Sequence, residues 1–389
     1  GARAPPYNHP VLWCRGASPG RARGARAAPA PDLIIVEGVM GLFDGEPSAA
    51  DLAERFGLHV LAVIDAGAMA GTFGALAWGL QHYRPAMPWA GVLANRVASE
   101  GHAAMLKNSM RAPADWLGAL MRNDTFTLPE RHLGLTVPGE VGDAMARLDA
   151  AADALAATPL GQMSASDLQR WAVDFAAPEA SEAVPPLLAG RSVAVARDGA
   201  FSFIYAANLQ TLEQLGARVS FFSPLDGDRL PPCDAVWLPG GYPELHAAQI
   251  AANTGLRADL QRHLEAGRPL WAECGGMVAL CEAVQLRDGA VQPLWGLLPG
   301  QATLHQRLVA LGPQQLPVAG EVLRGHTFHY STLVSGAPVI VRSSRPGEAS
   351  APDAGEVLYR QGSLHASYFH AWFASSPRAV AHLLGGEGA

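Results

Sequence analysis

The 389-residue sequence is poor in cysteine, in charge and in aromatic side chains. Its four cysteines are too few for a disulfide framework in so long a chain, and no pair of them has the spacing of a zinc site. Only 16% of the residues are charged, and the formal net charge is −7. This acidic balance argues against nucleic-acid binding, which needs a basic face. The scarcity of cysteine fits a reducing, cytoplasmic setting.

A long uncharged hydrophobic run is also missing. Residues 58–80 come nearest, but Asp65 lies in the middle, and Gly67 and Gly71 follow a strand-like stretch. We interpret this segment as a buried strand, a turn and a helix rather than a membrane span. The start of the chain is rich in arginine but has no apolar core after it, so we expect no signal peptide and no membrane partner.

The most informative stretch that is present surrounds Cys274. The apolar residues 268–272 predict a strand, Cys274 follows almost at once, and Gly275-Gly276 precede a segment compatible with a helix. This order predicts a nucleophile on a sharp strand-to-helix turn, with its sulfur exposed. The helix N-terminus beside it is expected to favour the thiolate. An inert buried cysteine is the structural alternative, and the turn favours the nucleophile.

A cysteine nucleophile needs a base, and seven histidines in the second half of the chain are candidates. Sequence spacing alone does not choose among them: His246, His263, His305, His326, His329, His365 and His370. The pair Gly240-Gly241 follows another predicted strand. With Gly275, its backbone N–H groups are candidates for an oxyanion hole, although an ordinary turn has the same sequence pattern.

Continuous apolar strands alternate with helical segments throughout, which indicates two α/β units with parallel sheets. Predicted strands cover 33–36, 59–64 and 89–94 in the first unit, and 192–196, 218–222 and 235–238 in the second. Glu37, Asp65 and Asn95 stand where strands of the first unit end, the usual place for a site. Residues 141–176 are expected to be a helical tract rich in alanine.

Composition divides the chain into four parts. Residues 1–31 are of low complexity and are expected to be disordered, 32–176 form the first domain, 177–189 a linker and 190–389 the second domain. In the first domain, Glu37 and Asp44 are carboxylates beside glycines, a pattern that suits Mg²⁺ next to nucleotide phosphates. A solvated loop is the alternative, and no phosphate loop of the G-x-x-x-x-G-K-[ST] type occurs.

Several motifs in this order resemble the cobyrinic acid a,c-diamide synthase family, also known for hydrogenobyrinic acid. They begin with Glu37-Gly-Val-Met-Gly-Leu-Phe-Asp-Gly45 and end with Ser367-Tyr-Phe-His370. Between them lie 95–97, 131–135, 201–205, 239–244, 272–276 and 324–331. The resemblance implies a P-loop-NTPase-like, dethiobiotin-synthetase-like first domain that lacks its first strand and phosphate loop. It implies a flavodoxin-like class I glutamine amidotransferase domain after it.

The resemblance also implies roles and ligands. Cys274 would attack glutamine with His370 as its base, and ATP would activate the a- and c-carboxylates of cobyrinate or hydrogenobyrinate for amidation by the released ammonia. Glu37 and Asp44 match positions near Mg²⁺, and Asn95 matches a position near the adenine. Roles for Arg131, His132, His326 and His329 stay open, as does the oligomeric state, with a homodimer as one option.

Two departures from the family pattern bear on activity. The family's phosphate loop and the segment that soon follows it are not in this sequence, so we expect an N-terminally incomplete synthetase. Trp372 stands where many class I amidotransferases have the glutamate of a triad, so we expect a Cys–His dyad. The alternatives are a glutaminase-only fragment, a nickel-sirohydrochlorin a,c-diamide synthase or cobyric acid synthase.

Overall fold

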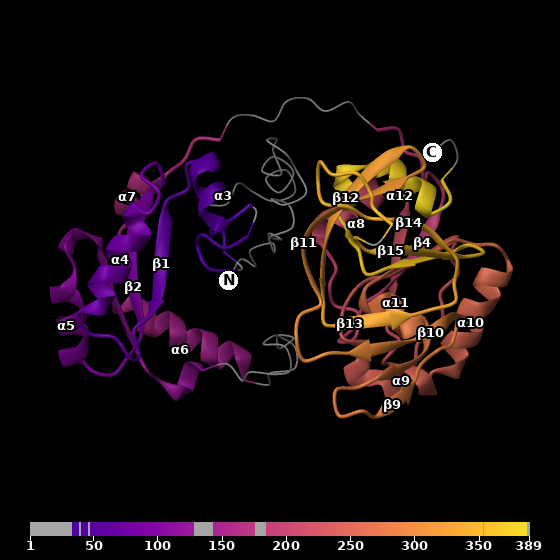
Figure 1. The fold of residues 1–389 in the computed structure, drawn as a ribbon, viewed down its shortest axis with the longest axis horizontal. Helices are drawn as coiled ribbons and strands as arrows, with labels where there is room; N and C mark the ends of the chain where they lie inside the picture. The colour runs from indigo at the N-terminus through magenta and orange to yellow at the C-terminus, as the bar shows by residue number, and fades with distance from the viewer. Residues whose placement is uncertain are drawn as a thin grey trace. The chain divides into compact units, whose positions relative to one another are not determined.

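The computed structural model describes residues 33–38, 40–45, 47–127, 143–175, 184–352 and 354–386. The chain divides into two compact units, one of Gly38–Ala176 and the other of Ala177–Ala389 with the residues up to Glu37 (Figure 1). The predicted disordered segment 1–31 and most of the predicted linker lie outside the described residues, as do Arg131 and His132.

The first unit is built on a parallel sheet in the order β1-β2-β3. Its strands are β1 (Val60–Asp65), β2 (Trp89–Val97) and β3 (Trp116–Met121). Two of them confirm the strands predicted at 59–64 and 89–94. Phe73, Val92 and Leu106 are fully buried in the core that the sheet shares with its helices.

The helices of the first unit begin and end at residues that suit those places. Ser48 and Asp51 form a capping box at the start of α3, and Gly57 ends that helix with φ of 66°. The helices are α3 (Ala49–Phe56), α4 (Thr72–His82), α5 (Glu100–Ser109), α6 (Ala144–Ala156) and α7 (Ala165–Leu168). Short 3₁₀ turns are η1 (Pro113–Asp115), η2 (Asp124–Phe126) and η5 (Gln169–Trp171).

Two sequence predictions for this half of the chain are corrected. The helical tract predicted for 141–176 is interrupted after α6, where Pro159 cannot continue the helix. The predicted buried strand at 33–36 is wrong: these residues form no strand, and Leu33 and Ile35 are 61% and 78% exposed. An apolar run becomes a buried strand only where neighbouring strands offer hydrogen bonds, and no described strand pairs with it.

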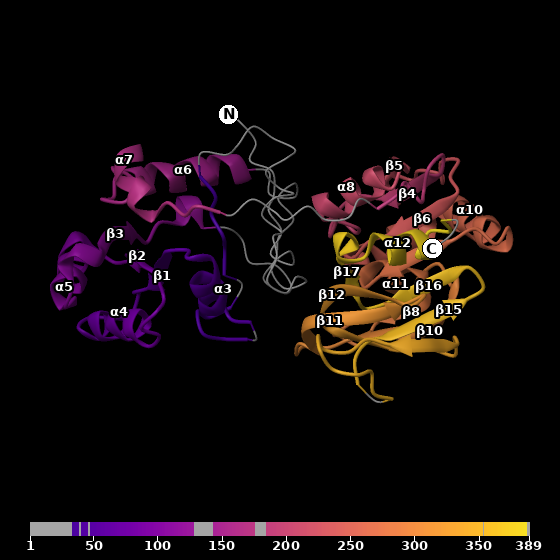
Figure 2. The same cartoon turned by 90° about the horizontal axis from the view of Figure 1, so that it is seen from above.

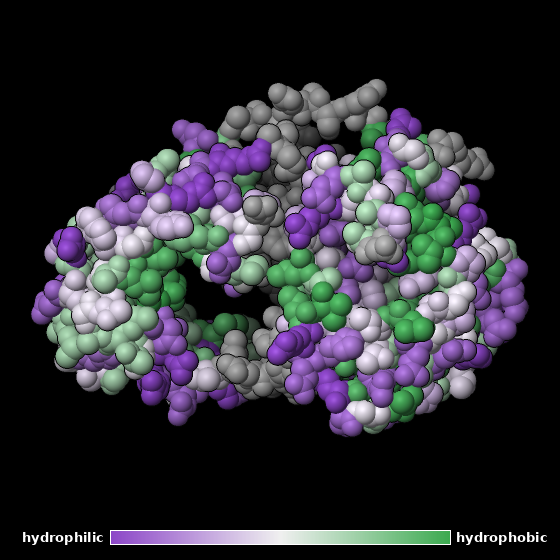
Figure 3. Space-filling model, viewed as in Figure 1, coloured by the Kyte–Doolittle hydropathy of each residue, from purple (hydrophilic) through white to green (hydrophobic). Residues whose placement is uncertain are grey.

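The strand β1 lies at the edge of the described sheet and is only partly covered. Leu61 and Val63 are 40% and 57% exposed. Figure 3 shows hydrophobic surface in the region of β1 on the face in view. None of the described helices is both long and apolar enough to cross a membrane, and residues 58–80 hold β1, a turn and most of α4 as predicted.

The second unit has a seven-stranded sheet in the order β14-β15-β16-β7-β6-β4-β5. The five strands from β16 to β5 are parallel, and β15 and β14 continue the sheet antiparallel. The strands are β4 (Ser192–Ala196), β5 (Arg218–Phe222), β6 (Ala235–Leu238), β7 (Leu270–Glu273), β14 (Val339–Arg342), β15 (Val357–Gln361) and β16 (Leu364–Ser367). Figure 2 shows β5 and β15 toward opposite ends of this unit.

Alternating side chains of these strands fill two cores on opposite faces of the sheet. In β4, Val193 and Val195 join the core with α8 and α12, whereas Ala194 and Ala196 join the core with α10 and α11. Both faces are therefore covered by helices, as the predicted doubly wound fold requires. The helices are α8 (Ala206–Gln214), α9 (Ala247–Ala252), α10 (Thr254–Glu265), α11 (Gly275–Leu280) and α12 (Pro377–Leu383).

Two smaller sheets complete the second unit, in the orders β13-β10-β8-β9 and β11-β12-β17. Their strands are β8 (Cys281–Gln285), β9 (Val291–Pro293), β10 (Leu298–Leu304), β11 (Ala310–Val318), β12 (Glu321–His329), β13 (Ser331–Val334) and β17 (His370–Ala371). Short 3₁₀ turns are η6 (Pro243–His246) and η7 (Phe373–Ser375). The sequence predictions named none of these secondary sheets.

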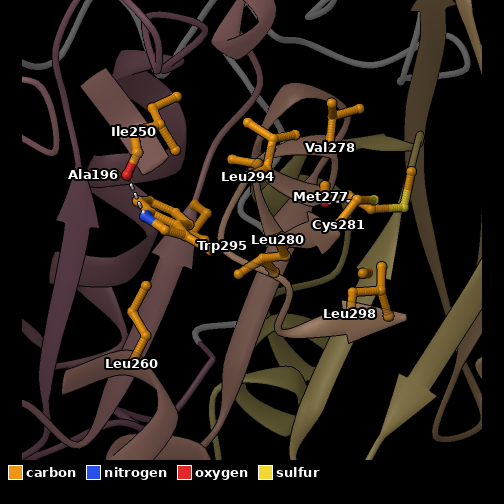
Figure 4. Packing of buried hydrophobic residues seen from close by; sticks show 14 of the residues in the cluster. Ala196, Ile250, Leu260, Met277, Val278, Leu280, Cys281, Leu294, Trp295 and Leu298 are labelled. Carbon is orange, nitrogen blue, oxygen red and sulfur yellow. Dashed lines mark hydrogen bonds between the residues drawn. The ribbon is translucent and has the colours of Figure 1, made fainter. Parts of the chain in front are cut away.

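Trp295 anchors the core beside α9 and α10. Its ring is fully buried, and its indole N–H donates a hydrogen bond to the carbonyl oxygen of Ile250 at 2.9 Å (Figure 4). This bond satisfies a buried carbonyl at α9, so the large side chain fixes the helix through a polar contact as well as through packing.

We expect Trp295→Phe to lower the free energy of unfolding by about 0.5–1.5 kcal/mol beyond the effect of the smaller ring, because the Ile250 carbonyl loses its indole donor and keeps only the bond from the Asn253 amide. Urea unfolding followed by circular dichroism measures the change. Trp372→Phe is the matched control, since Trp372 is buried but its indole N–H has no hydrogen-bond partner among the described residues. Equal losses in the two variants would contradict this role of the bond.

Candidate active site

Three neighbouring parallel strands bring the predicted second-domain residues together. β6, β7 and β16 are adjacent in the sheet, and their carboxyl ends lie at the same edge. Gly240 and Gly241 follow β6, Cys274 follows β7, and His370 follows β16 by three residues. The carboxyl edge of a parallel sheet is where sites form, because the loops there converge.

Cys274 occupies the sharp turn that the sequence predicts. Its backbone has φ of 46° and ψ of −110°, one of three positive φ angles at non-glycine residues among the described part of the chain. Its amide donates a hydrogen bond to the Ser367 carbonyl at 2.7 Å, and α11 begins at Gly275. This strained conformation costs free energy and is held by the surrounding bonds, as is common at functional sites.

The thiol itself differs from the prediction, which had the sulfur exposed and ionised. Cys274 is only 7% exposed. Burial raises the pKa of its thiol, and the nearby Glu244 carboxylate raises it further, while the Gly275 N–H opposes them. One short helix of six residues does not offset this desolvation. The resting cysteine is therefore a thiol.

His370 is the base that the family resemblance implies, and its imidazole is buried. Burial lowers its pKa well below the ordinary value, and the neighbouring His326 and His329 lower it further. The imidazole is therefore neutral near pH 7. Its Nδ1 has no hydrogen-bond partner among the described residues.

Packing orients the His370 ring. His370 pairs with His326 across β17 and β12, and the two rings stack with centroids 4.8 Å apart and planes 11° apart. Phe203 approaches from another side, with ring centroids 6.0 Å apart. The Tyr205 hydroxyl lies 3.3 Å from His326 Nε2. The imidazole thus has His326 of β12 and Phe203 of the segment after β4 as neighbours, and Tyr205 contacts His326 behind it.

The predicted glycines pack against these two residues. A Cβ atom on Gly240 would lie 3.0 Å from His370 Nδ1, and one on Gly275 would lie 2.8 Å from the Gly241 nitrogen. Only glycine fits such close approaches. The structure therefore brings Gly240, Gly241 and Gly275 beside the cysteine and the histidine, as the oxyanion prediction requires.

Two polar residues that sequence reasoning missed hold the histidine segment. Glu273 is buried and accepts hydrogen bonds from the Ala371 amide and from the indole N–H of Trp271. Burial raises its pKa to about 8. Asn208 donates to the Ala371 carbonyl at 2.8 Å and accepts from the Phe373 amide at 2.9 Å. Only the position of Glu273 next to Cys274 was a signal in the sequence.

Three of the other candidate histidines have structural partners. His329 bridges the Glu356 carboxylate at 3.0 Å and the Ser331 carbonyl at 2.7 Å, and it stacks on Tyr368. His263 lies 3.0 Å from the Pro269 carbonyl, and His305 lies 2.9 Å from the Thr332 hydroxyl. These contacts explain each of the three without a catalytic role.

In the first unit, Asn95 and Asp65 stand side by side where β2 and β1 end. Asp65 accepts a hydrogen bond from the Gly67 amide and forms an exposed ion pair of 3.2 Å with Arg96. Arg96 has φ of 58°, and its amide donates to the Asn95 side chain at 2.9 Å. The edge therefore presents a compact polar turn around Asn95.

The carboxylates predicted to hold Mg²⁺ are both exposed. Asp44 turns back over Gly41, with its amide donating to the Gly41 carbonyl at 2.9 Å. No cluster of three or more metal-ligating side chains occurs among the described residues. The described residues there thus form no dedicated protein cage, although Mg²⁺ often binds through one or two carboxylates together with substrate phosphates.

Comparison with known proteins places this geometry in context. Residues 192–378 match the CobB/CobQ-like glutamine amidotransferase domain family. The chain is 49% identical to the hydrogenobyrinate a,c-diamide synthase of Stutzerimonas stutzeri, over 96% of this chain and 84% of that protein. It is 47% identical to the enzyme of that name from Pseudomonas aeruginosa, over 96% and 83%. It is 40% identical to the cobyrinate a,c-diamide synthase of Herminiimonas arsenicoxydans, over 97% and 84%.

The buried thiol leads to a test that needs no substrate. We expect iodoacetamide to alkylate Cys274 more slowly than free N-acetylcysteine at pH 7–8, because its raised pKa leaves little thiolate. The rate should keep rising with pH above 9. Peptide mass spectrometry follows each cysteine separately, and Cys281, whose pKa burial raises to about 12, is the internal control. A rate plateau below pH 7 would contradict the neutral thiol.

Proposed function

We propose, from the premise that this chain belongs to the family of hydrogenobyrinate and cobyrinate a,c-diamide synthases, that it forms amides on a corrin substrate with glutamine as nitrogen donor. The glutamine amidotransferase domain that matches residues 192–378 supplies the ammonia. Its acceptors are the a- and c-carboxylates of hydrogenobyrinate or cobyrinate, in line with the names of its relatives. The enzyme is then a carbon–nitrogen ligase of cobalamin biosynthesis.

One observation supports the glutamine half most strongly. Cys274 lies on a strained turn between the glycine turn after β6 and the histidine after β16, all at one edge of a parallel sheet. A nucleophile, a neutral base and close-packed backbone N–H groups are the parts that acyl transfer from an amide needs.

The chemistry follows from the protonation states. His370 accepts the Cys274 proton as the sulfur attacks the side-chain carbonyl carbon of glutamine. The amides of Gly241 and Gly275 are the proposed donors to the oxyanion, and Gly240 leaves room for the imidazole. His370 then gives the proton to the departing ammonia, which leaves a γ-glutamyl thioester on Cys274. Water attacks this thioester and releases glutamate.

The first unit is the proposed synthetase domain. Its three parallel strands, with Asn95 at the edge where β1 and β2 end, suit a P-loop-NTPase-like fold with the adenine of ATP near Asn95. Glu37 and Asp44 would hold Mg²⁺, which when bound neutralises charge on the phosphates. ATP activates the corrin carboxylate as an acyl phosphate, and ammonia displaces the phosphate to form the amide.

The same function assigns domains, a cellular compartment and substrates to the chain. We propose 32–176 as the ATP- and corrin-binding domain, 177–189 as a linker and 190–389 as the amidotransferase domain. Cys233, Cys274 and Cys281 are free, which fits a reducing cytoplasm. Glutamine, ATP and the corrin acid are the partners that this chemistry requires.

Replacing the nucleophile separates ammonia production from its use. We expect Cys274→Ser to lower glutamine hydrolysis by about 10³-fold or more, because serine is a much weaker nucleophile without a strong base. ATP-dependent amidation of hydrogenobyrinate with ammonium salts should be unchanged. Glutamate release and mass spectrometry of the corrin product measure the two activities. Loss of both activities in a folded variant would contradict this division of labour.

A methyl group at Gly240 should disturb the base without removing it. We expect Gly240→Ala to lower glutaminase kcat by about 10²-fold, because the new Cβ would press on the His370 ring and a shift of about 1 Å has such an effect. Gly336→Ala is the matched control, since a Cβ there meets no atom within 4 Å. Similar rates in the two variants would show that the His370 position is not critical.

A further inference from the structure

Two charged side chains near Cys274 have no part in the chemistry described so far. Glu244 lies in η6, directly after Pro243, whose Cδ would be 2.8 Å from a Cβ atom on Gly275. η6 therefore packs against the start of α11, next to the nucleophile. The negative charge of Glu244 raises the pKa of the Cys274 thiol, and only burial has a larger effect on that pKa.

Arg287 reaches the same region from the turn after β8. Its Nε donates to the His305 carbonyl at 3.0 Å, and its guanidinium carbon lies 5.8 Å from the centre of the Tyr330 ring. Tyr330 in turn packs edge-on against Phe328, whose carbonyl oxygen lies 4.0 Å from the Cys274 sulfur. Arg287 is thus connected to the nucleophile through two ring contacts.

Only part of the Arg287 guanidinium is hydrogen-bonded to the described residues. Arg287 Nη2 is buried and has no hydrogen-bond partner among the described residues. The Tyr242 hydroxyl, two residues before Glu244, is buried and unpartnered in the same way. A buried donor without an acceptor is costly, so such groups at a site are explained when a ligand satisfies them.

The Glu244 carboxylate and the Arg287 guanidinium influence each other electrostatically but form no ion pair. Arg287 lowers the pKa of Glu244, yet burial outweighs it and raises that pKa to about 7. No ion pair between them occurs among the described residues. Because the two charges do not pair with each other, each can pair with the opposite charge of one ligand.

We propose that Glu244 and Arg287 bind the α-ammonium and α-carboxylate groups of glutamine and so present its side-chain amide to Cys274. The inference rests on the proposed glutaminase function and names the residues that select a free amino acid. A zwitterion supplies an acceptor for Arg287 Nη2 and a cation for Glu244. Amides within peptides lack one or both charges, so the pair would exclude them.

The test removes each charge from the protein and from the substrate in turn. Glutaramate is glutamine without its α-ammonium group, and 4-aminobutanamide is glutamine without its α-carboxylate. For the unchanged chain, we expect kcat/KM to fall about 10- to 100-fold with each analogue, which is the usual effect of losing one charged hydrogen bond. The loss should appear mainly in KM.

Each variant should be impaired with glutamine but not with the analogue that lacks the charge its mutated residue binds. We expect Glu244→Gln to lower kcat/KM for glutamine about 10- to 100-fold but to leave glutaramate unaffected, because that analogue has no ammonium group to lose. Arg287→Met should lower kcat/KM for glutamine but not for 4-aminobutanamide, because that analogue has no α-carboxylate. Glu265→Gln and Arg360→Met, both exposed and remote in sequence from the turn, are the controls.

Different results would overturn the binding roles of Glu244 and Arg287 and the proposed glutaminase function. Equal losses for glutamine and both analogues in each variant would overturn the proposed binding roles while leaving the glutaminase intact. Release of no ammonia from glutamine by the unchanged chain would overturn the proposed function, and the inference with it. Far-UV circular dichroism and thermal unfolding of every variant show whether an inactive glutaminase is still folded.

Discussion

The parallel pairing of β6, β7 and β16 is the constraint on which the candidate site depends. The register places Glu273 opposite Ser367, and the bond from the Cys274 amide to the Ser367 carbonyl extends that ladder by one residue into the turn. Without this pairing the glycine turn, the cysteine and the histidine would be loops more than thirty residues apart in sequence. The hydrophobic cores on both faces keep the strands in register, because a slip of one residue would exchange the two sets of buried side chains.

The protonation states also follow from this arrangement. Burial acts in opposite senses on the two reacting groups, since it disfavours the charged form of each. It raises the pKa of the Cys274 thiol and lowers that of the His370 imidazole, so both are neutral at rest. A neutral, buried thiol is a weak nucleophile, which protects the resting sulfur from oxidation and from stray electrophiles.

The sequence predicted much of this site because its signals are local. A strand, a cysteine and two glycines in succession predict the turn at Cys274, and the strands at 192–196, 218–222 and 235–238 are confirmed. Burial of the thiol was missed because it depends on residues distant in sequence, such as Phe328. The same holds for Asn208, which looks like any polar helix residue. The apolar run at 33–36 shows the reverse error, since its pattern predicts a buried strand but no described strand pairs with it.

Asn208 holds only main-chain atoms of the histidine segment, one on each side of Trp372. The Trp372 ring itself packs elsewhere, in a small buried cluster with Ala374 and Tyr205. A change of side chain at 372 therefore acts through that cluster, whereas the main chain on both sides of it keeps the hydrogen bonds that Asn208 supplies.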